Sequence, residues 1–220
     1  MAVTATRTVR DIVTRALRKS RVVGVNQDPT SWDAKTAMHD LDDMLKEWQS
    51  SGFNLWTWTE GTKTLTTAVS YDLAVVRPIS IMNVRYKGTD GVEVPMVPLT
   101  RWEYDSISDK DSTGTPSQFH YDRQREAAKL YIWPALASAT TESIEFTYQR
   151  EVEDITSLND TIDMPGEWWS TVVYNLASRL IDTYALENPG VQARAEQLFK
   201  RQMAFDREGS VYFNRGENDR

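Results

Sequence analysis

Residues 164–186, MPGEWWSTVVYNLASRLIDTYAL, carry the apolar pattern that decides the fold class. Apolar side chains recur in this stretch at intervals of three and four residues, which is the spacing of one broad face of an α-helix. Pro165 suits the first turn, where a helix does not need the missing N–H. The apolar face comprises Trp168, Val172, Val173, Leu176, Ala177, Leu180, Ile181 and Tyr184. A face this broad predicts a helix that ends near Leu186 and packs within a bundle.

Three other segments share this helical periodicity. Residues 6–22 combine an apolar face with a basic one. Residues 31–50 follow Thr30 and Asp33, which have the spacing of a capping box, and the polar face of this segment is acidic. Residues 191 to about 207 form the last periodic segment. Helices are therefore expected at both ends of the chain.

Residues 53–150 instead contain short β-branched and aromatic runs separated by turn residues. This pattern predicts about seven strands in a half-buried antiparallel sheet or a small sandwich. A turn at Glu60-Gly61 is expected to join strands over 53–59 and 63–67, which would place Trp56 and Trp58 on one strand face.

Two further turn and cap signals lie inside the strand region. Gly88–Gly91 is expected to join strands over 78–87 and 92–99, because its residues suit a hairpin turn. Thr100 and Glu103 have the spacing of a second capping box, which predicts a short helix.

The predicted fold class is α+β, with a bundle of about four helices formed from both chain ends and an inserted antiparallel β module. The expected ranges are 1–52 and 151–208 for the bundle, 53–150 for the β module and 209–220 for a C-terminal tail. The aromatic residues of that tail have no evident partner within the chain, which is typical of a segment that orders on binding.

Composition excludes several kinds of chemistry. The 220 residues include no cysteine, which rules out a disulfide scaffold, a cysteine nucleophile and a thiolate metal site. No apolar run is long enough to span a membrane, so no membrane association is expected. Phosphate-binding loops, dinucleotide fingerprints and nucleophile elbows are absent from the sequence. We therefore expect no catalytic, cofactor-binding or metal-binding residues, and a protein that is not an enzyme.

Charge is distributed unevenly along the chain. The formal net charge is −7, yet residues 1–23 carry six basic side chains and only one acid. An acidic protein of this kind is a poor candidate for non-specific duplex binding. The basic segment is better explained as a surface that docks on an acidic neighbour, with Arg15 and Arg18 as candidate subunit contacts.

Two weak signals leave an alternative open. The acids between Glu151 and Asp163 and the eight tryptophans could serve a hydrolase that acts on cell-wall glycan. Packing is the better explanation of the tryptophans, since Trp48 and Trp168 lie on apolar helix faces. A calcium-loop start at Asp109 has His120 where a bidentate Glu is required.

An ordered set of short motifs resembles a known family. After Trp48 come Gly52-Phe-Asn-Leu-Trp56, Tyr71-Asp-Leu73, Gly114-Thr-Pro-Ser-Gln-Phe-His-Tyr121, Leu130-Tyr-Ile-Trp-Pro134, Met164-Pro-Gly-Glu-Trp168 and Leu176-Ala-Ser-Arg-Leu180. In this order, over residues 6–213, they resemble the head-to-tail adaptors of short-tailed bacteriophages, also called tail accessory factors or packaged-DNA stabilisation proteins.

The resemblance implies a structural virion protein of the tail or neck, assembled in the host cytoplasm. It implies a homo-oligomeric ring of about twelve subunits beneath the portal protein. Such a ring extends the DNA channel, helps retain the packaged genome, and supports a tail nozzle, needle, fibre or spike protein. Packaged duplex DNA would pass through without sequence-specific binding. The portal-binding segment would include Val211, Tyr212, Phe213 and Arg215. A connector or tail completion protein of another phage type is the other alternative.

Overall fold

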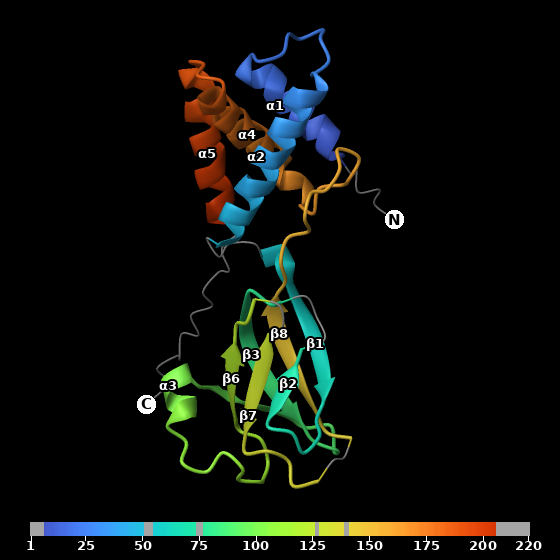
Figure 1. The fold of residues 1–220 in the computed structure, drawn as a ribbon, viewed down its shortest axis with the longest axis vertical. Helices are drawn as coiled ribbons and strands as arrows, with labels where there is room; N and C mark the ends of the chain where they lie inside the picture. Colours follow the sequence, from blue (N-terminus) through green and yellow to red (C-terminus); the bar gives the residue numbers. More distant parts are fainter. Residues whose placement is uncertain (1–6, 51–54, 74–76, 126–127, 139–140, 206–220) are drawn as a thin grey trace, which may run out of the picture. The chain divides into compact units, whose positions relative to one another are not determined.

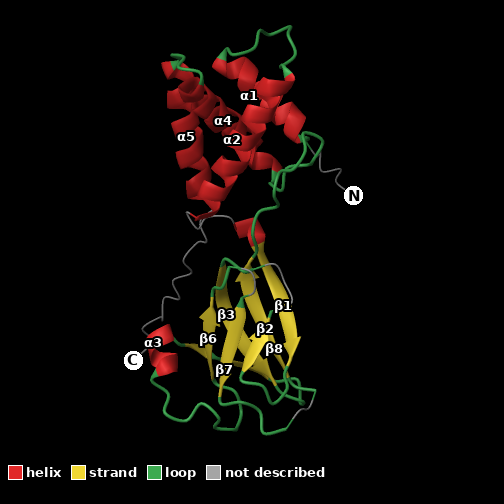
Figure 2. Ribbon diagram, viewed as in Figure 1, coloured by secondary structure: helices red, strands yellow, loops and turns green. Residues whose placement is uncertain are grey.

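The computed structural model describes residues 7–50, 55–73, 77–125, 128–138 and 141–205. The chain divides into two compact units. The helical unit comprises the residues up to Trp56 and those from Val152 onward, and the β unit comprises Thr57–Glu151. The labelled strands belong to the β unit only (Figures 1 and 2). The fold class is α+β, as predicted.

Four α-helices from both chain ends build the helical unit. α1 and α4 pack against each other, α5 packs on α4, and α2 contacts both α1 and α4. Their buried side chains form one shared core. The helices are α1 (Val9–Ser20), α2 (Ser31–Ser50), α4 (Trp169–Thr183) and α5 (Pro189–Phe205), with the 3-10 turn η2 (Gly166–Trp168) before α4.

The helix ends differ slightly from the predicted ranges. The Thr30 hydroxyl accepts a hydrogen bond from the backbone N–H of Asp33 over 3.1 Å, so the predicted cap of α2 is present. α1 is shorter than the predicted 6–22, because Thr8 caps its start and Arg21 ends it in the left-handed conformation, with φ 68°. Pro165 lies one position outside the first turn, as the cap of η2.

The acidic segment that follows the β unit packs on the bundle rather than linking two units freely. The backbone N–H groups of Val9 and Arg10 donate to the carbonyls of Asp160 and Leu158, each over 2.9 Å. The backbone N–H of Ile155 donates to the Asp42 carboxylate over 3.1 Å. The bonds of Val9 and Arg10 satisfy donors at the start of α1 that a helix cannot satisfy itself.

Two four-stranded sheets build the β unit, in the orders β1-β8-β3-β4 and β2-β7-β6-β5. All pairs are antiparallel except β5 and β6. Side chains of both sheets share one core, so the unit is a small sandwich. The elements are β1 (Trp58–Thr64), β2 (Ser70–Asp72), β3 (Ser80–Lys87), β4 (Glu93–Pro95), β5 (Val97–Pro98), α3 (Arg101–Asp105), β6 (Gln118–Asp122), β7 (Lys129–Trp133) and β8 (Ser143–Gln149).

The predicted hairpin at Glu60-Gly61 is wrong. β1 runs straight through Gly61 and pairs along its length with β8, where Gly61 lies opposite Phe146. A Cβ atom on Gly61 would lie 2.6 Å from the Phe146 ring. The glycine therefore allows a close approach of a buried ring and does not form a turn.

The predicted strand over 92–99 is divided between the two sheets. β4 pairs with β3, β5 pairs with β6, and the buried Met96 lies between them. The turn at Gly88–Gly91 is confirmed, with Gly91 at φ +80° and its N–H bonded to the Gly88 carbonyl over 3.0 Å. The predicted capping box of Thr100 is also present, at the start of α3.

The predicted placement of Trp56 on a strand is wrong as well. Trp56 lies in the 3-10 turn η1 (Leu55–Thr57), whereas Trp58 begins β1. The Trp56 ring packs 5.3 Å from that of Trp168 within the helical unit. Trp48 and Trp168 are both buried in that core, as expected.

We predict that Gly61→Ala destabilises the protein by about 1–3 kcal/mol, because the new methyl group must displace the buried Phe146 ring. Gly114→Ala is the matched control, since its Cβ would meet Pro134 at an ordinary 3.7 Å. The control should be neutral or stabilising by up to about 1 kcal/mol. Urea unfolding of both variants measures the difference, and a Gly61→Ala protein as stable as the control would contradict the close packing.

Candidate functional site

The predicted contact residues fall into two groups. Arg15 and Arg18 both lie on α1. The predicted portal-binding residues Val211, Tyr212, Phe213 and Arg215 lie outside the described residues.

Arg18 is engaged by its own chain. Its Nη2 atom lies 3.6 Å from a carboxylate oxygen of Asp28 and donates to the Gln27 carbonyl over 3.1 Å. Both partners belong to the loop between α1 and α2. The Arg18 charge is thus directed toward that loop.

Arg15 lines a hollow between α1, α4 and α5. This hollow has a volume of about 320 Å³, and its lining includes Arg7, Lys19, Ser170 and Arg194. Arg15 and Lys19 are four residues apart on α1 and so share one helix face. Arg15 and Arg18 were predicted together as subunit contacts. Arg15 lines this hollow, whereas Arg18 contacts the loop between α1 and α2.

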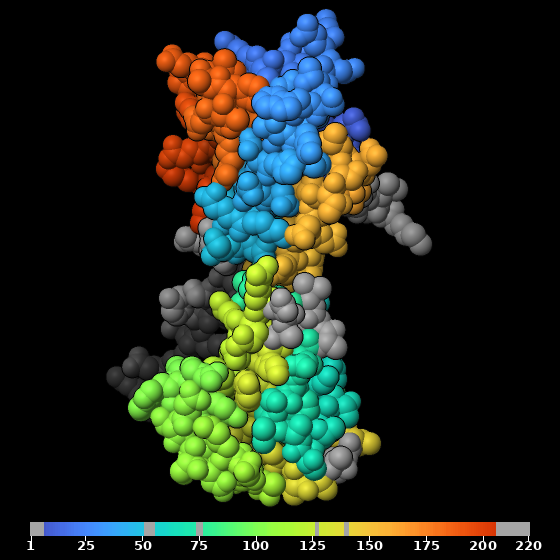
Figure 3. All heavy atoms as spheres, viewed as in Figure 1, coloured from blue at the N-terminus to red at the C-terminus, as the bar shows by residue number. Residues whose placement is uncertain are grey.

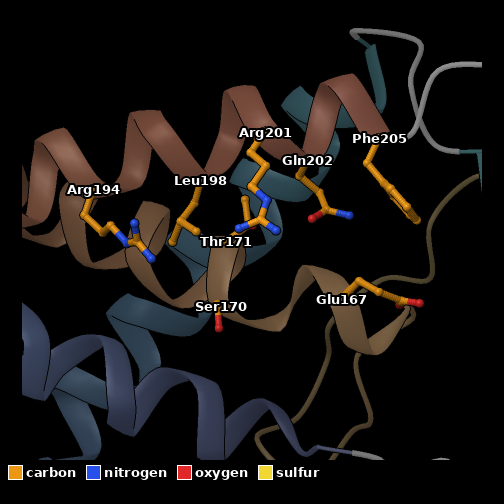
Figure 4. A pocket seen from close by; sticks show the side chains of 8 residues that line it. All are labelled: Glu167, Ser170, Thr171, Arg194, Leu198, Arg201, Gln202 and Phe205. Atoms are coloured by element: carbon orange, nitrogen blue, oxygen red, sulfur yellow. The ribbon is translucent and has the colours of Figure 1, made fainter.

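A second hollow of about 420 Å³ shares Ser170, Arg194 and Leu198 with the first. Figure 4 shows Arg194, Leu198 and Arg201 on the side of α5 that faces the start of α4. We call the two hollows together the cationic groove. Its cations are Arg7, Arg15, Lys19, Arg194 and Arg201.

Aromatic and polar contacts orient the groove cations without neutralising them. The Arg7 guanidinium lies 4.4 Å from the centre of the Trp169 ring, and Lys19 Nζ lies 4.3 Å from that of Tyr174. Lys19 also donates to the Tyr174 hydroxyl over 3.1 Å. Within the described part of the chain, none of the five groove cations forms an ion pair with a carboxylate. A cluster of like charges held this way is suited to an anionic partner.

An acidic strip follows α2 on the same unit. We define this strip as Asp40, Asp43 and Glu47, whose spacing places them along one helix face. Glu47 forms an ion pair with Arg179 of α4, and Asp40 accepts a hydrogen bond from the Thr183 hydroxyl over 3.3 Å.

Asp43 and Asp33 differ in their surroundings. Asp43 is exposed and has no bonded partner among the described residues. Asp33 is not part of the strip, because hydrogen bonds from Thr30 and from the Tyr184 hydroxyl hold its carboxylate and keep its pKa below the usual value.

Sequence reasoning missed Arg7, Lys19, Arg194 and Arg201. Arg194 and Arg201 are seven residues apart and so share a face of α5, which is a readable signal. The packing of α5 beside α4 brings them toward α1, and that packing is not encoded in local periodicity.

The described residues hold no group of three or more His, Cys, Asp or Glu that could bind a metal. His120, which ends the weak calcium-loop match, lies on β6 with Nδ1 3.0 Å from the Leu99 carbonyl oxygen. Among the described helices, none has the length and apolar character needed to cross a membrane.

Comparison with known proteins finds similarity to solved structures only. No family model matches the chain, and no curated protein matches it. The chain is similar to a chain from the neck of an empty gene transfer agent particle, computed with C6 symmetry. The two chains are 15% identical, the alignment covers 97% of each, and the TM-score is 0.31.

We predict that Arg15→Glu and Arg18→Glu change the stability of the monomer in opposite directions. Arg15→Glu removes repulsion in the groove and gains a partner in Lys19, so unfolding should cost about 0.3–0.5 kcal/mol more. Arg18→Glu places an acid beside Asp28 in the last turn of α1, so unfolding should cost about that much less. Urea titrations at low ionic strength measure the free energy of unfolding of both variants. Equal losses of stability would contradict a groove whose cations lack carboxylate partners among the described residues.

Proposed function

We propose that the protein is a structural head-to-tail connector of a phage-like particle rather than an enzyme. It forms a ring beneath the portal, extends the DNA channel, helps retain the packaged genome and supports the next tail component. It is a virion component of the neck, and α1 contributes to subunit contact through Arg15, whereas Arg18 contacts the loop of its own chain.

The observation that carries the proposal is the junction formed by three of the family-like motifs. Trp48, Trp56 and Trp168 come from three separate motifs of the ordered set. Their rings lie together, with Trp168 5.7 Å from Trp48 and 5.3 Å from Trp56. The motifs are therefore parts of one structural unit. This supports the resemblance to the adaptor family, and the connector role follows from that resemblance.

Charge also favours this role. A net charge of −7 would repel the phosphates of a passing duplex over a short range, so the DNA would slide without adhering. The acids that face the channel are proposed to come from residues 151–163. Several acids of this segment also bond within the helical unit; Asp160, for example, accepts hydrogen bonds from the backbone N–H groups of Thr156 and Ser157.

Negative-stain electron microscopy of the purified protein, alone and mixed with the portal protein of the same particle, tests the proposal. We expect closed rings, either free or seated on the portal. A protein that stays monomeric and never binds the portal would contradict the connector role. Clearing in a glycan zymogram would instead favour a cell-wall hydrolase.

We predict that deletion of residues 209–220 leaves the fold intact and weakens portal binding by more than about tenfold, because the apolar anchors Val211, Tyr212 and Phe213 are lost. Circular dichroism and a portal pull-down titration measure the two effects. Lost helicity or solubility would show that the segment belongs to the core.

A further inference from the structure

We propose that the cationic groove of one copy binds the acidic strip of the next copy, in a head-to-tail contact within the helical units. This inference rests on the proposed ring assembly and names the two surfaces that would form it. The occupant of the groove is a second copy of this chain.

The groove has the charge and shape for an acidic side-chain cluster. Five cations line its two hollows, and within the described residues none of them is paired with a carboxylate. Lys19 and Arg7 are already oriented by aromatic rings, which lowers the entropy lost when they bind an anion. The Ser170 hydroxyl adds a donor shared by both hollows. Glu167, at the second hollow, is the acid among the lining residues.

The acidic strip supplies the complementary charge. Asp43, at its centre, is exposed and has no bonded partner in the described part of the chain. Arg179 holds Glu47, and Thr183 donates to Asp40, so the strip is fixed against α4 by residues of that helix. Three carboxylates with one arginine leave the strip negative, and α2 presents them along about two turns.

The two surfaces lie on opposite sides of α4, which makes a contact between copies possible. Ser170 and Tyr174 line the groove, whereas Arg179 and Thr183 hold the strip. Ser170 and Arg179 are nine residues apart, and so are Tyr174 and Thr183. Nine residues make about two and a half helical turns, so the two members of each pair lie on opposite sides of α4. A chain cannot fill its own groove with its own strip across the helix.

Two different complementary surfaces on one subunit produce a heterologous contact. Such a contact repeats from copy to copy and closes into a ring when the rotation between neighbours allows closure. The groove–strip pair therefore provides the kind of contact that a ring-forming connector requires.

Reciprocal charge reversal tests the proposal. The groove variant is Arg15→Glu, with Arg18→Glu as the control that makes the same charge change on the same helix. The strip variant is Asp43→Lys, with Glu187→Lys as the control, because Glu187 is exposed on the turn between α4 and α5. Sedimentation velocity of the full chain at 0.1 M and 1 M salt reports the assembly state.

We expect wild type and both controls to associate in low salt and to dissociate in high salt, where the Debye length contracts from about 10 Å to about 3 Å. Each reversal alone should weaken association at least about tenfold. An equimolar mixture of Arg15→Glu and Asp43→Lys should associate again, because the native groove of one variant matches the native strip of the other and the two reversed surfaces also match each other. The double variant Arg15→Glu/Asp43→Lys should associate again, because its reversed charges are complementary.

Three results would overturn the proposal. Arg15→Glu associating as strongly as Arg18→Glu would show that the groove is not the junction. A wild-type chain that is monomeric at every concentration would also overturn it, although rings formed on the portal would still support the connector function. Binding of a fluorescent DNA duplex that is lost in Arg15→Glu, with self-association unchanged, would assign the groove to phosphate instead.

Discussion

The packing of Trp48, Trp56 and Trp168 is the contact on which the rest of the structure depends. Trp48 lies near the end of α2, Trp56 lies where the chain leaves the helical unit, and Trp168 ends η2, which leads into α4. Phe199 of α5 adds a fourth ring, 5.0 Å from Trp48. Aromatic pairs of this kind contribute about 0.5–1.5 kcal/mol each beyond the area that they bury. They join helices from both chain ends although the whole β unit separates them in sequence.

This junction anchors the start of α4, which also packs on α1 and α5. α4 in turn separates the charges of the helical unit. One side of α4 borders the cationic groove and the other holds the acidic strip. Several groove cations have no carboxylate partner among the described residues. Such a cluster of like charges costs stability in the isolated chain, and proteins commonly accept that cost where a surface must bind a partner. The net charge of −7 therefore hides an arrangement suited to contact between copies, together with an acidic remainder suited to a passing duplex.

Local signals in the sequence predicted the elements that depend on local physics. The caps at Thr30 and Thr100 and the turn at Gly91 follow from short-range hydrogen bonds and backbone freedom. The predicted turn at Gly61 was wrong because a glycine between two β-branched runs is typical of a turn. Only the Phe146 ring packed against it shows why a glycine is needed in a continuous strand. In the same way, Arg15 and Arg18 look equivalent until the packing of α1 directs one toward α5 and the other toward Asp28. Non-local packing, which no periodicity encodes, decides both cases.

A cryo-electron microscopy reconstruction of the protein assembled on its portal would show directly which surfaces of neighbouring subunits meet. The cationic groove of each subunit, with Arg15, should lie over Asp43 of its neighbour around a closed ring. A ring whose subunits meet through other surfaces, with Arg15 and Asp43 both facing solvent, would contradict this arrangement.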